Sequence, residues 1–507
     1  MVYNASRSTP MAKVVLISTY ELGHQPFGLA SPAAWLRARG LEVTCFDLSR
    51  EAFREPVVRE ADAIAFYVPM HTATRLAAQL IERVRPLNPL AHLCFYGLYA
   101  PVNATYLRGL GVEMIIGGEF EQTLADWVSR LAEASHGNGQ TQPDAVPERT
   151  HTAISLDRLS FIVPDRAGLP ALREYAHLLL PDGGYRVAGY TEGSRGCKHL
   201  CCHCPIVPVY NGVFRVVPRE MILEDIRRQV AAGAEHITFG DPDFFNGPTH
   251  ALAIVEAMHR EFPQLSYDVT IKIEHLLHHA EKIERLRDTG CLFVTTAVES
   301  VDDAILSHLD KGHTRADFLK VVAHFRQLGL AMQPTFVPFT PWTTLDGYRD
   351  LLSVIADQDL TENIAPIQLG IRLLIPEGSR LLELGDFRSQ LGPFDPVGLS
   401  HPWKHADPRM DALANRVQDV ASAGDSLKRS RTETFAEIWR AAAEAAGDDS
   451  VAAAWHPPAA APRPIPHFTE PWYCCAEPTR DQFVSIGASA LVASQPDAPL
   501  DISNVFV

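Results

Sequence analysis

Short apolar runs alternate with amphipathic stretches along the first quarter of the chain. The runs of strand length are KVVLIST (13–19), LEVTCFDL (41–48), AIAFYVPM (63–70), HLCFYGLY (92–99) and EMIIGG (113–118). Residues 31–40 and 72–86, which lie between them, carry apolar positions at helical spacing. Apolar strands that alternate with helices are typical of a parallel sheet covered on both faces. The pattern therefore predicts an α/β domain over residues 11–134.

A second series of strands and helices begins near residue 186. Its expected strands cover residues 185–193, 235–241, 267–273, 292–300, 330–339 and 367–375. Amphipathic helices such as 221–233 and 279–290 separate them. Six strand–helix units predict a partial (β/α)6 TIM-like barrel over residues 185–400, with functional groups on the carboxyl side of its strands.

Five strands at the spacing of the first series favour a flavodoxin-like (Rossmann-type) sheet, whose ligands lie outside the carboxyl ends of the strands. Residues 135–184 are expected to form a linker or connector, because 135–152 are polar and rich in Gly and Pro. The alternation of strand-like and helix-like segments ends near residue 400. We expect residues 401–507 to form an α-rich C-terminal extension with a flexible tail, because 441–468 are rich in Ala and Pro.

Composition limits the partners and the compartment. The chain has 507 residues, and 45 Lys and Arg against 61 Asp and Glu give a net charge of −16. This balance disfavours a nucleic-acid partner and favours a small-molecule substrate. No apolar run approaches the ~20 residues of a membrane span, and the first ten residues lack the build of a signal peptide. We expect a cytoplasmic protein without a membrane partner. Its odd number of cysteines, nine, argues against a disulfide framework.

Three cysteines follow the first barrel strand in a C-x3-C-x2-C pattern: Cys197, Cys201 and Cys204. Three thiolates on one loop can hold three irons of a 4Fe–4S cluster and leave the fourth iron open. Zinc is the alternative, and Cys202, His199 or His203 would then supply a fourth ligand. We favour the iron–sulfur cluster, because a zinc site alone does not account for the position of this loop directly after the first strand of a six-unit barrel. We interpret Cys202 as a packed residue.

The loop, preceded by Ser194-Arg195-Gly196, resembles the signature of the radical S-adenosylmethionine (SAM) superfamily. Residues 240–246, GDPDFFN, resemble the segment that cradles the SAM amino group, although they depart from the family's Gly-Gly-Glu form. Glu299-Ser300 resembles the position that contacts SAM, and LSHLDKGHT (306–314) is what relatives carry next. The resemblance covers roughly residues 186–400. It implies a 4Fe–4S cluster, SAM and an electron donor such as flavodoxin or ferredoxin.

The resemblance implies SAM contacts by a set of residues at the ends of the barrel strands: Gly240, Asp241, Asp243, Glu299 and Ser300. Alternatively, Asp241 and Asp243 are helix N-caps. Lys272 either binds a cofactor or forms a salt bridge with Glu274. Arg372, on the sixth expected strand, is a candidate anchor for a carboxylate.

The amino-terminal sheet resembles the cobalamin-binding domain of class B radical SAM enzymes, through residues 21–36 and 117–124. The candidate cobalamin-binding residues are Gly23, Gly28, Gly117, Gly118 and Glu119. Glycines at such turns let the backbone approach a flat ligand. The D-x-H-x-x-G motif that supplies an axial histidine is absent, and neither His24 nor His71 replaces it. Cobalamin would then bind without that ligand. The alternative is a sheet retained only as a scaffold.

The tail WYCCAEP (472–478) resembles the CUAEP/CCAEP-tail group of radical SAM proteins, in which some relatives place selenocysteine at the first of the two positions. That exchange favours Cys474 as a nucleophile, a redox group or a soft ligand. We therefore take Cys474 and Cys475 as candidate catalytic residues. The alternative is an inert tail.

Together these resemblances imply a cobalamin-dependent radical SAM enzyme that acts on a small molecule, with methyl transfer or another radical-mediated transformation as the expected reaction. An alternative keeps the radical SAM core but alkylates arsenic, or another thiophilic element, held by Cys474 and Cys475. A third hypothesis is a non-catalytic metal or redox sensor, which would be loaded with zinc and would leave SAM intact.

Overall fold

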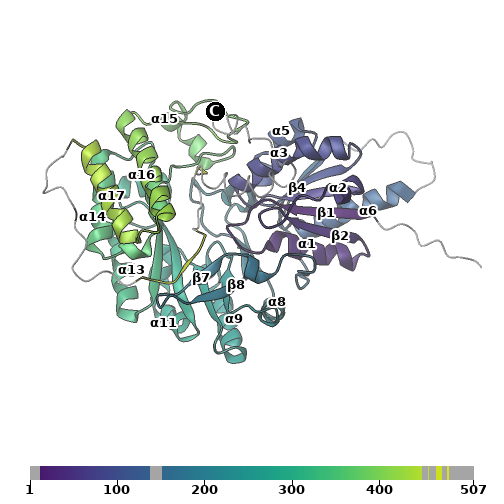
Figure 1. Ribbon diagram of the computed structural model, residues 1–507, viewed down its shortest axis with the longest axis horizontal. Helices are drawn as coiled ribbons and strands as arrows, with labels where there is room; N and C mark the ends of the chain where they lie inside the picture. The colour runs from purple at the N-terminus through teal and green to yellow at the C-terminus, as the bar shows by residue number, and fades with distance from the viewer. Residues whose placement is uncertain (1–11, 137–150, 448–454, 456–463, 471–476, 479–507) are drawn as a thin grey trace, which may run out of the picture. The chain divides into compact units, whose positions relative to one another are not determined.

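The computed structural model describes residues 12–136, 151–447, 455, 464–470 and 477–478. They divide into two compact units (Figure 1). The first unit contains the described residues up to Glu21 together with Pro26–Pro170. The second contains Leu22–Gln25 and the described residues from Ala171 to residue 478. No helix among the described residues is long and apolar enough to cross a membrane.

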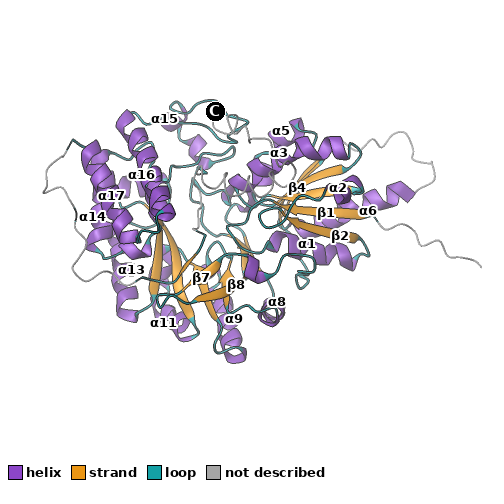
Figure 2. Ribbon diagram, viewed as in Figure 1, coloured by secondary structure: helices purple, strands orange, loops and turns teal. Residues whose placement is uncertain are grey.

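The first unit is built on a six-stranded parallel sheet (Figure 2). Its strands are β1 (Lys13–Ser18), β2 (Glu42–Asp47), β3 (Ala63–Tyr67), β4 (His92–Tyr96), β5 (Met114–Gly118) and β6 (His151–Ser155). The order β2-β1-β3-β4-β5-β6 begins as in flavodoxin-like folds and adds β6 beside β5. The flavodoxin-like expectation is confirmed. Strand β6 lies in the segment for which the sequence predicts only a connector.

Helices cover both faces of this sheet. They are α1 (Phe27–Ala38), α2 (Glu55–Arg59), α3 (His71–Leu87), α4 (Tyr99–Val102), α5 (Ala104–Gly109) and α6 (Phe120–His136). Val15 and Ile17 of β1 pack in one apolar cluster with residues of α3, whereas Val14 and Leu16 pack in another with residues of α1 and α6. Burial on both faces explains why these strands are apolar at nearly every position.

The second unit contains a seven-stranded sheet in the order β14-β13-β12-β11-β8-β7-β15. Its strands are β7 (His177–Leu179), β8 (Tyr185–Thr191), β11 (His236–Phe239), β12 (Ser266–Thr270), β13 (Cys291–Glu299), β14 (Ala331–Phe336) and β15 (His467–Phe468). Neighbours from β8 to β14 are parallel, and β7 and β15 join antiparallel. A separate ribbon pairs β9 (Ser194–Gly196) with β10 (Phe214–Val216). The expectation of a partial barrel is confirmed.

Helices connect the strands of the partial barrel and build the C-terminal extension. They are α7 (Val207–Tyr210), α8 (Arg219–Ala231), α9 (Pro248–Glu261), α10 (Ile273–His278), α11 (Ala280–Asp288), α12 (Asp303–His308), α13 (Arg315–Leu328), α14 (Leu345–Asp357), α15 (Gly385–Arg388), α16 (Pro408–Ser426) and α17 (Arg431–Ala445). A capping box of Thr314 and Asp317 starts α13, and Gly329 ends it in the left-handed conformation. The last two helices, α16 and α17, pack together, so the extension is α-rich as expected.

The sixth expected strand, residues 367–375, is much shorter in the structure. The chain forms a 3₁₀ helix over Pro366–Gly370, and only then does Arg372 bridge to Phe339 in parallel. Gly370 lies so close to Gln418 of α16 that an added Cβ would come within 2.9 Å of it. This segment therefore packs against α16 and does not form a longer series of β-sheet hydrogen bonds. Its alternating apolar residues 371, 373 and 375 are still buried.

Candidate functional site

The cysteine loop leaves the barrel after β8 and the short strand β9. Asp241, which follows β11, holds the start of this loop. Its carboxylate accepts hydrogen bonds from the Gly193 N–H at 2.7 Å and the Ser194 hydroxyl at 2.6 Å. Burial raises the pKa of Asp241 to about 7, against the lowering effect of these bonds. Asp241 is not the N-cap residue of the helical turn that follows, so the alternative of a helix cap does not describe it.

The thiols of Cys197 and Cys201 are buried, and Cys204 is half-buried. Burial raises the pKa of Cys197 to about 12, so a proton must leave when this thiol binds a metal. Among the described cysteines, no three sulfurs all lie within 4.8 Å of one another. In a tetrahedral zinc site the sulfurs would be ~3.8 Å apart. A cluster in which each thiolate binds a different iron does not require the three sulfurs to lie that close together.

Cys202 belongs to the packing of the unit. Its side chain contacts an apolar cluster that includes Ile305 and Leu309, and its N–H donates to the Leu309 carbonyl at 2.9 Å. These contacts support its interpretation as a packed residue and disfavour it as a fourth ligand.

Glu299, at the end of β13, is buried between two basic side chains. Its Oε1 lies 3.1 Å from Lys311 Nζ and 3.2 Å from His203 Nε2. Burial alone would raise the pKa of this carboxyl, but Lys311 and His203 outweigh burial and lower it to about 2. Glu299 also has a φ of 67°, a left-handed conformation that is uncommon outside glycine. A charged, strained and buried carboxylate at a barrel strand end is typical of a functional position.

The sequence alone did not predict Lys311 and His203 as partners of Glu299. Lys311 lies in the loop after α12, and His203 lies between two candidate cluster cysteines. Their convergence depends on the packing of three segments, which spacing in the sequence cannot show. Nearby His313 is also buried, and burial together with Lys311 and Lys272 lowers the pKa of its ring to about 4.

Other expected SAM contacts lie along the same strand ends. Lys272 Nζ is 3.5 Å from Cys201 Sγ and 3.8 Å from Glu274 Oε2, so the ion pair with Glu274 exists alongside a contact with the cysteine loop. The Ser300 hydroxyl accepts the Asp302 N–H at 3.1 Å. Gly240 leaves room for Tyr190, because an added Cβ would lie 1.9 Å from the Tyr190 hydroxyl oxygen and the ring would have to move.

Asp243 caps the 3₁₀ helix Phe244–Asn246, because its Oδ1 accepts the Phe245 N–H at 3.1 Å. This confirms the alternative of a helix cap for Asp243 without excluding a second role. The other oxygen, Oδ2, faces His199 and His275. The sequence did not single out His275 either, because it comes from α10, far along the chain from the cysteine loop.

Arg372 binds carboxylates of the chain itself. Its guanidinium donates to Asp411 at 2.6 Å, to Glu477 at 3.2 Å and to the Trp403 carbonyl at 3.1 Å. Arg372 therefore pairs with two carboxylates of the protein itself, those of Asp411 and Glu477. Its binding of a cofactor stays a prediction. Cys474 and Cys475 lie outside the described residues, so their catalytic role stays a prediction too.

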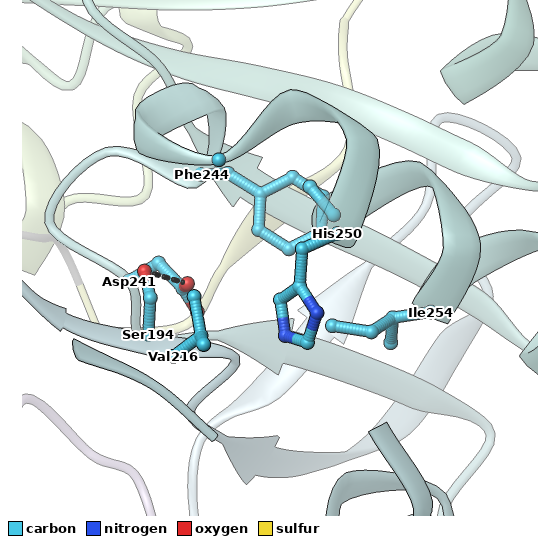
Figure 3. Close-up of a pocket in the computed structure, with 8 residues that line it drawn as sticks. Ser194, Val216, Asp241, Phe244, His250 and Ile254 are labelled. Atoms are coloured by element: carbon cyan, nitrogen blue, oxygen red, sulfur yellow. Dashed lines mark hydrogen bonds between the residues drawn. The ribbon is translucent and has the colours of Figure 1, made fainter. Parts of the chain in front are cut away.

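A narrow hollow lies beside Asp241 (Figure 3). Ser194, Val216, Phe244, His250 and Ile254 line it, and the Ser194–Asp241 hydrogen bond crosses one side of it. It leaves no room for a molecule of water, so these contacts act as packing that holds the start of the cysteine loop.

The candidate glycines of the amino-terminal domain pack against protein atoms. An added Cβ would lie 2.1 Å from the Tyr67 ring at Gly28, 2.3 Å from Pro101 at Gly117 and 2.1 Å from the Ser155 carbonyl oxygen at Gly118. At Gly23, which belongs to the second unit, it would meet Ala176 and Glu470. Close packing therefore explains these glycines, and any contact with a ligand stays a prediction.

Buried polar side chains gather where the strands of the first sheet end. They are Ser18 at the end of β1, Thr19 directly after it, His71 after β3, and Glu119 after β5. The Ser18 hydroxyl has no hydrogen-bond partner among the described residues. Buried polar groups normally find a partner, so the carboxyl edge of this sheet fits a polar ligand.

Residues 191–343, which run from the end of β8 past β14, match the model of the radical SAM superfamily. These residues therefore form a radical SAM domain. The cofactors of this superfamily are a 4Fe–4S cluster and SAM.

Curated relatives of this chain include a methylase and a methylthiotransferase. The hopanoid C-3 methylase of Methylococcus capsulatus is 25% identical over an alignment of 329 residues, which covers 63% of this chain and 62% of the methylase. The ribosomal protein uS12 methylthiotransferase RimO of Parabacteroides distasonis is 22% identical over an alignment of 184 residues, which covers 33% of this chain and 41% of RimO. The matches span less than two thirds of both relatives.

Solved structures that share the fold of this chain include two cobalamin-binding proteins. The radical SAM methyltransferase TsrM of Kitasatospora setae, with cobalamin and a 4Fe–4S cluster bound, has a TM-score of 0.52 at 16% identity and covers 69% of this chain and 71% of its own. The cobalamin-dependent SAM radical enzyme OxsB has a TM-score of 0.62 at 13% identity and covers 82% of this chain and 67% of its own. At these identities the likeness shows a common fold.

Proposed function

We propose that this protein is a cobalamin-dependent radical SAM methyltransferase that acts on a small molecule. The observation that carries the proposal is the three-cysteine loop at the carboxyl end of the first barrel strand, in a chain that also has a flavodoxin-like sheet. TsrM and OxsB, whose fold is similar over most of this chain, bind cobalamin. The hopanoid C-3 methylase, similar over 63% of this chain, adds a methyl-transferring relative.

Cys197, Cys201 and Cys204 would hold the cluster. When bound, the cluster supplies the electron that cleaves SAM, and cobalamin supplies a carrier for the methyl group. The Lys272 ammonium donates a hydrogen bond to Cys201 Sγ at 3.5 Å and so helps to position that ligand. Asp241 fixes the start of the loop through its two hydrogen bonds. Flavodoxin or ferredoxin would be the electron donor.

Glu299 would bind SAM as an ionised acceptor. Lys311 and His203 both approach its Oε1, and a carboxylate has about four acceptor positions. Oε2 is therefore available for a hydroxyl or ammonium group of SAM. Because the pKa of Glu299 is about 2, this acceptor stays charged throughout the neutral range.

Cobalamin would lie at the carboxyl edge of the first sheet, where Ser18, His71 and Glu119 are buried. His71 begins α3, and its ring lies edge-on to Tyr99 with centroids 6.3 Å apart. Because the D-x-H-x-x-G motif is absent, we propose that cobalamin binds without an axial histidine from that motif.

The test is an anaerobic incubation of cluster-reconstituted protein with SAM, a chemical reductant and hydroxocobalamin. We expect mass spectrometry to find 5′-deoxyadenosine, and S-adenosylhomocysteine as the sign of methyl transfer. Both should disappear in Cys197→Ala. Cys202→Ser is the matched control from the same loop, because Cys202 packs against apolar residues, and it should retain both products.

A colourless protein that carries zinc and leaves SAM intact would contradict the proposal. 5′-Deoxyadenosine without S-adenosylhomocysteine would retain the radical chemistry and exclude methyl transfer under these conditions. The double variant Cys474→Ser, Cys475→Ser tests the thiol tail. Unchanged products in this variant would exclude the tail as the site that accepts the transferred group.

A further inference from the structure

His313 is a buried histidine in the loop between α12 and α13, and only 7% of its surface is exposed. The loop lies beside the cysteine loop, because the Cys202 N–H donates to the Leu309 carbonyl at 2.9 Å. It also lies against the start of α10, since an added Cβ at Gly312 would come within 2.7 Å of Glu274 Oε2. The fold therefore holds His313 next to the segments that carry the candidate cluster ligands.

The ring of His313 lacks hydrogen bonds that a buried imidazole normally makes. Neither Nδ1 nor Nε2 has a well-aligned hydrogen-bond partner among the described residues. The Lys311 backbone, which raises the pKa of the ring and so acts as an acceptor, can satisfy one nitrogen at most. At least one nitrogen is then left without a partner. Because an unsatisfied buried polar group is costly, it indicates a ligand that supplies the missing bond.

The charge state of His313 shows which kind of bond is missing. Burial lowers the pKa of the ring to about 4, and the ammonium groups of Lys311 and Lys272 act in the same direction. The ring is therefore neutral at pH 7, with one N–H donor and one nitrogen that carries a free lone pair. With its N–H directed at the Lys311 backbone, the other nitrogen is an acceptor that no described residue satisfies.

We infer that His313 binds SAM by accepting a hydrogen bond from an N–H or O–H group of the cofactor. Lys272 donates to Cys201, a candidate cluster ligand, at 3.5 Å. Lys311 pairs with Glu299, a candidate SAM contact, at 3.1 Å. The charges of Lys272, Lys311 and Glu299 all act on the ring. His313 therefore lies in the region that the proposed function assigns to SAM, and the inference rests on that function.

His236 of β11 provides a contrast, because both nitrogens of this buried ring have partners. Its Nδ1 lies 2.7 Å from the Ser266 hydroxyl oxygen, and its Nε2 lies 2.9 Å from Asp268 Oδ1. Removal of the His236 ring would leave two buried partners unpaired and would destabilise the fold. Removal of the His313 ring would break no well-aligned hydrogen bond. The two histidines should therefore differ in their contribution to the stability of the protein.

The test is the affinity of cluster-reconstituted protein for SAM, measured anaerobically by isothermal titration calorimetry. No reductant is added, so SAM is not cleaved and the readout does not depend on activity. His313→Leu, which has no polar side-chain atom, should weaken binding about 10-fold. His313→Gln keeps a donor and an acceptor and should restore most of the affinity. His278→Leu changes an exposed histidine of α10 and should bind SAM as the wild type does.

Urea unfolding of the cofactor-free variants separates a binding role of His313 from a structural one. His313→Leu should have a denaturation midpoint close to that of the wild type, because it loses no well-aligned hydrogen bond. His236→Leu should have a clearly lower midpoint, because Ser266 and Asp268 lose their partner.

5′-Methylthioadenosine, which has the nucleoside but not the amino acid part of SAM, locates the contact. If His313→Leu weakens the binding of both ligands equally, the donor is a hydroxyl or amino group of the nucleoside. If it weakens the binding of SAM alone, the donor is the ammonium group.

Two results would overturn the inference without affecting the proposed function. One is a His313→Leu protein that binds SAM with the affinity of the wild type. The other is a His313→Leu protein with a clearly lowered midpoint and weak binding that His313→Gln does not restore, which would make the role of the ring structural. A wild-type protein that does not bind SAM would overturn the inference and the proposed function together.

Discussion

At the scale of single residues, the partners of Glu299 make a stability prediction. Glu299→Gln would remove the carboxylate of a buried ion pair with Lys311, and loss of one member of a buried pair costs about 3–5 kcal/mol. We expect a clearly lower denaturation midpoint in urea at pH 7. Glu281→Gln is the control, because Glu281 pairs with Lys282 at the surface, and its midpoint should not change. Equal midpoints for the Glu299 variant and the wild type would contradict the pairing.

The same carboxylate predicts a dependence on pH. The pKa of Glu299 is lowered from its ordinary 4.5 to about 2 in the folded chain. Its ionised form therefore stabilises the fold above pH 4.5, and this stabilisation is lost as the pH falls from 4.5 towards 2. A difference of about 2.5 pKa units corresponds to about 3 kcal/mol. Denaturation midpoints of cluster-free protein between pH 7 and pH 3 should fall more steeply for the wild type than for Glu299→Gln. Parallel curves would contradict the lowered pKa.

The candidate residues differ in how far the sequence alone could predict them. The cysteine loop was predictable, because its three ligands lie within eight residues and follow a strand. Lys311, His203 and His275 were not, because each is an ordinary charged or polar residue until the fold brings it to a partner on another segment. Contacts across β-strand ends depend on packing, which local spacing does not encode.

At the scale of secondary structure, Gly118 shows how closely β5 and β6 are joined. Gly118 has a φ of 73°, and an added Cβ would lie 2.1 Å from the Ser155 carbonyl oxygen of β6. Gly118→Ala should therefore destabilise the fold by about 2–5 kcal/mol, from the left-handed backbone and the overpacking together. Thermal or urea unfolding followed by circular dichroism would measure it. Gly109→Ala, at the end of α5 with nothing near its Cβ, should be neutral or slightly stabilising. Similar losses in both variants would contradict the argument.

The elements themselves were largely predictable. The expected strands of both series correspond to β1–β5 and to the parallel strands β8 and β11–β14, because each is a short apolar run followed by a helix. The sixth barrel strand was overestimated, since the 3₁₀ helix Pro366–Gly370 packs against α16. Strand β6 was missed because HTAIS has few apolar residues and lies at the edge of its sheet. Both failures come from tertiary contacts at the margins of a sheet.

At the scale of the whole molecule, the division into two units has a consequence for cofactor loading. The first unit packs around its own apolar clusters on the two faces of its sheet, and the second has clusters of its own, such as the one under the cysteine loop. The candidate cobalamin edge and the candidate cluster ligands belong to different units. A change confined to one unit should leave the fold of the other intact.

We therefore expect Cys197→Ala, Cys201→Ala, Cys204→Ala protein to lose its iron and its cleavage of SAM while still binding hydroxocobalamin. Binding would be measured from the corrinoid absorption that remains after desalting, with wild-type protein in parallel. The cysteines do not belong to the first sheet, so their loss removes none of its buried polar groups. A triple variant that keeps its fold by circular dichroism but retains no corrinoid would show that the first sheet does not hold cobalamin by itself. That result would favour the scaffold alternative for the first sheet.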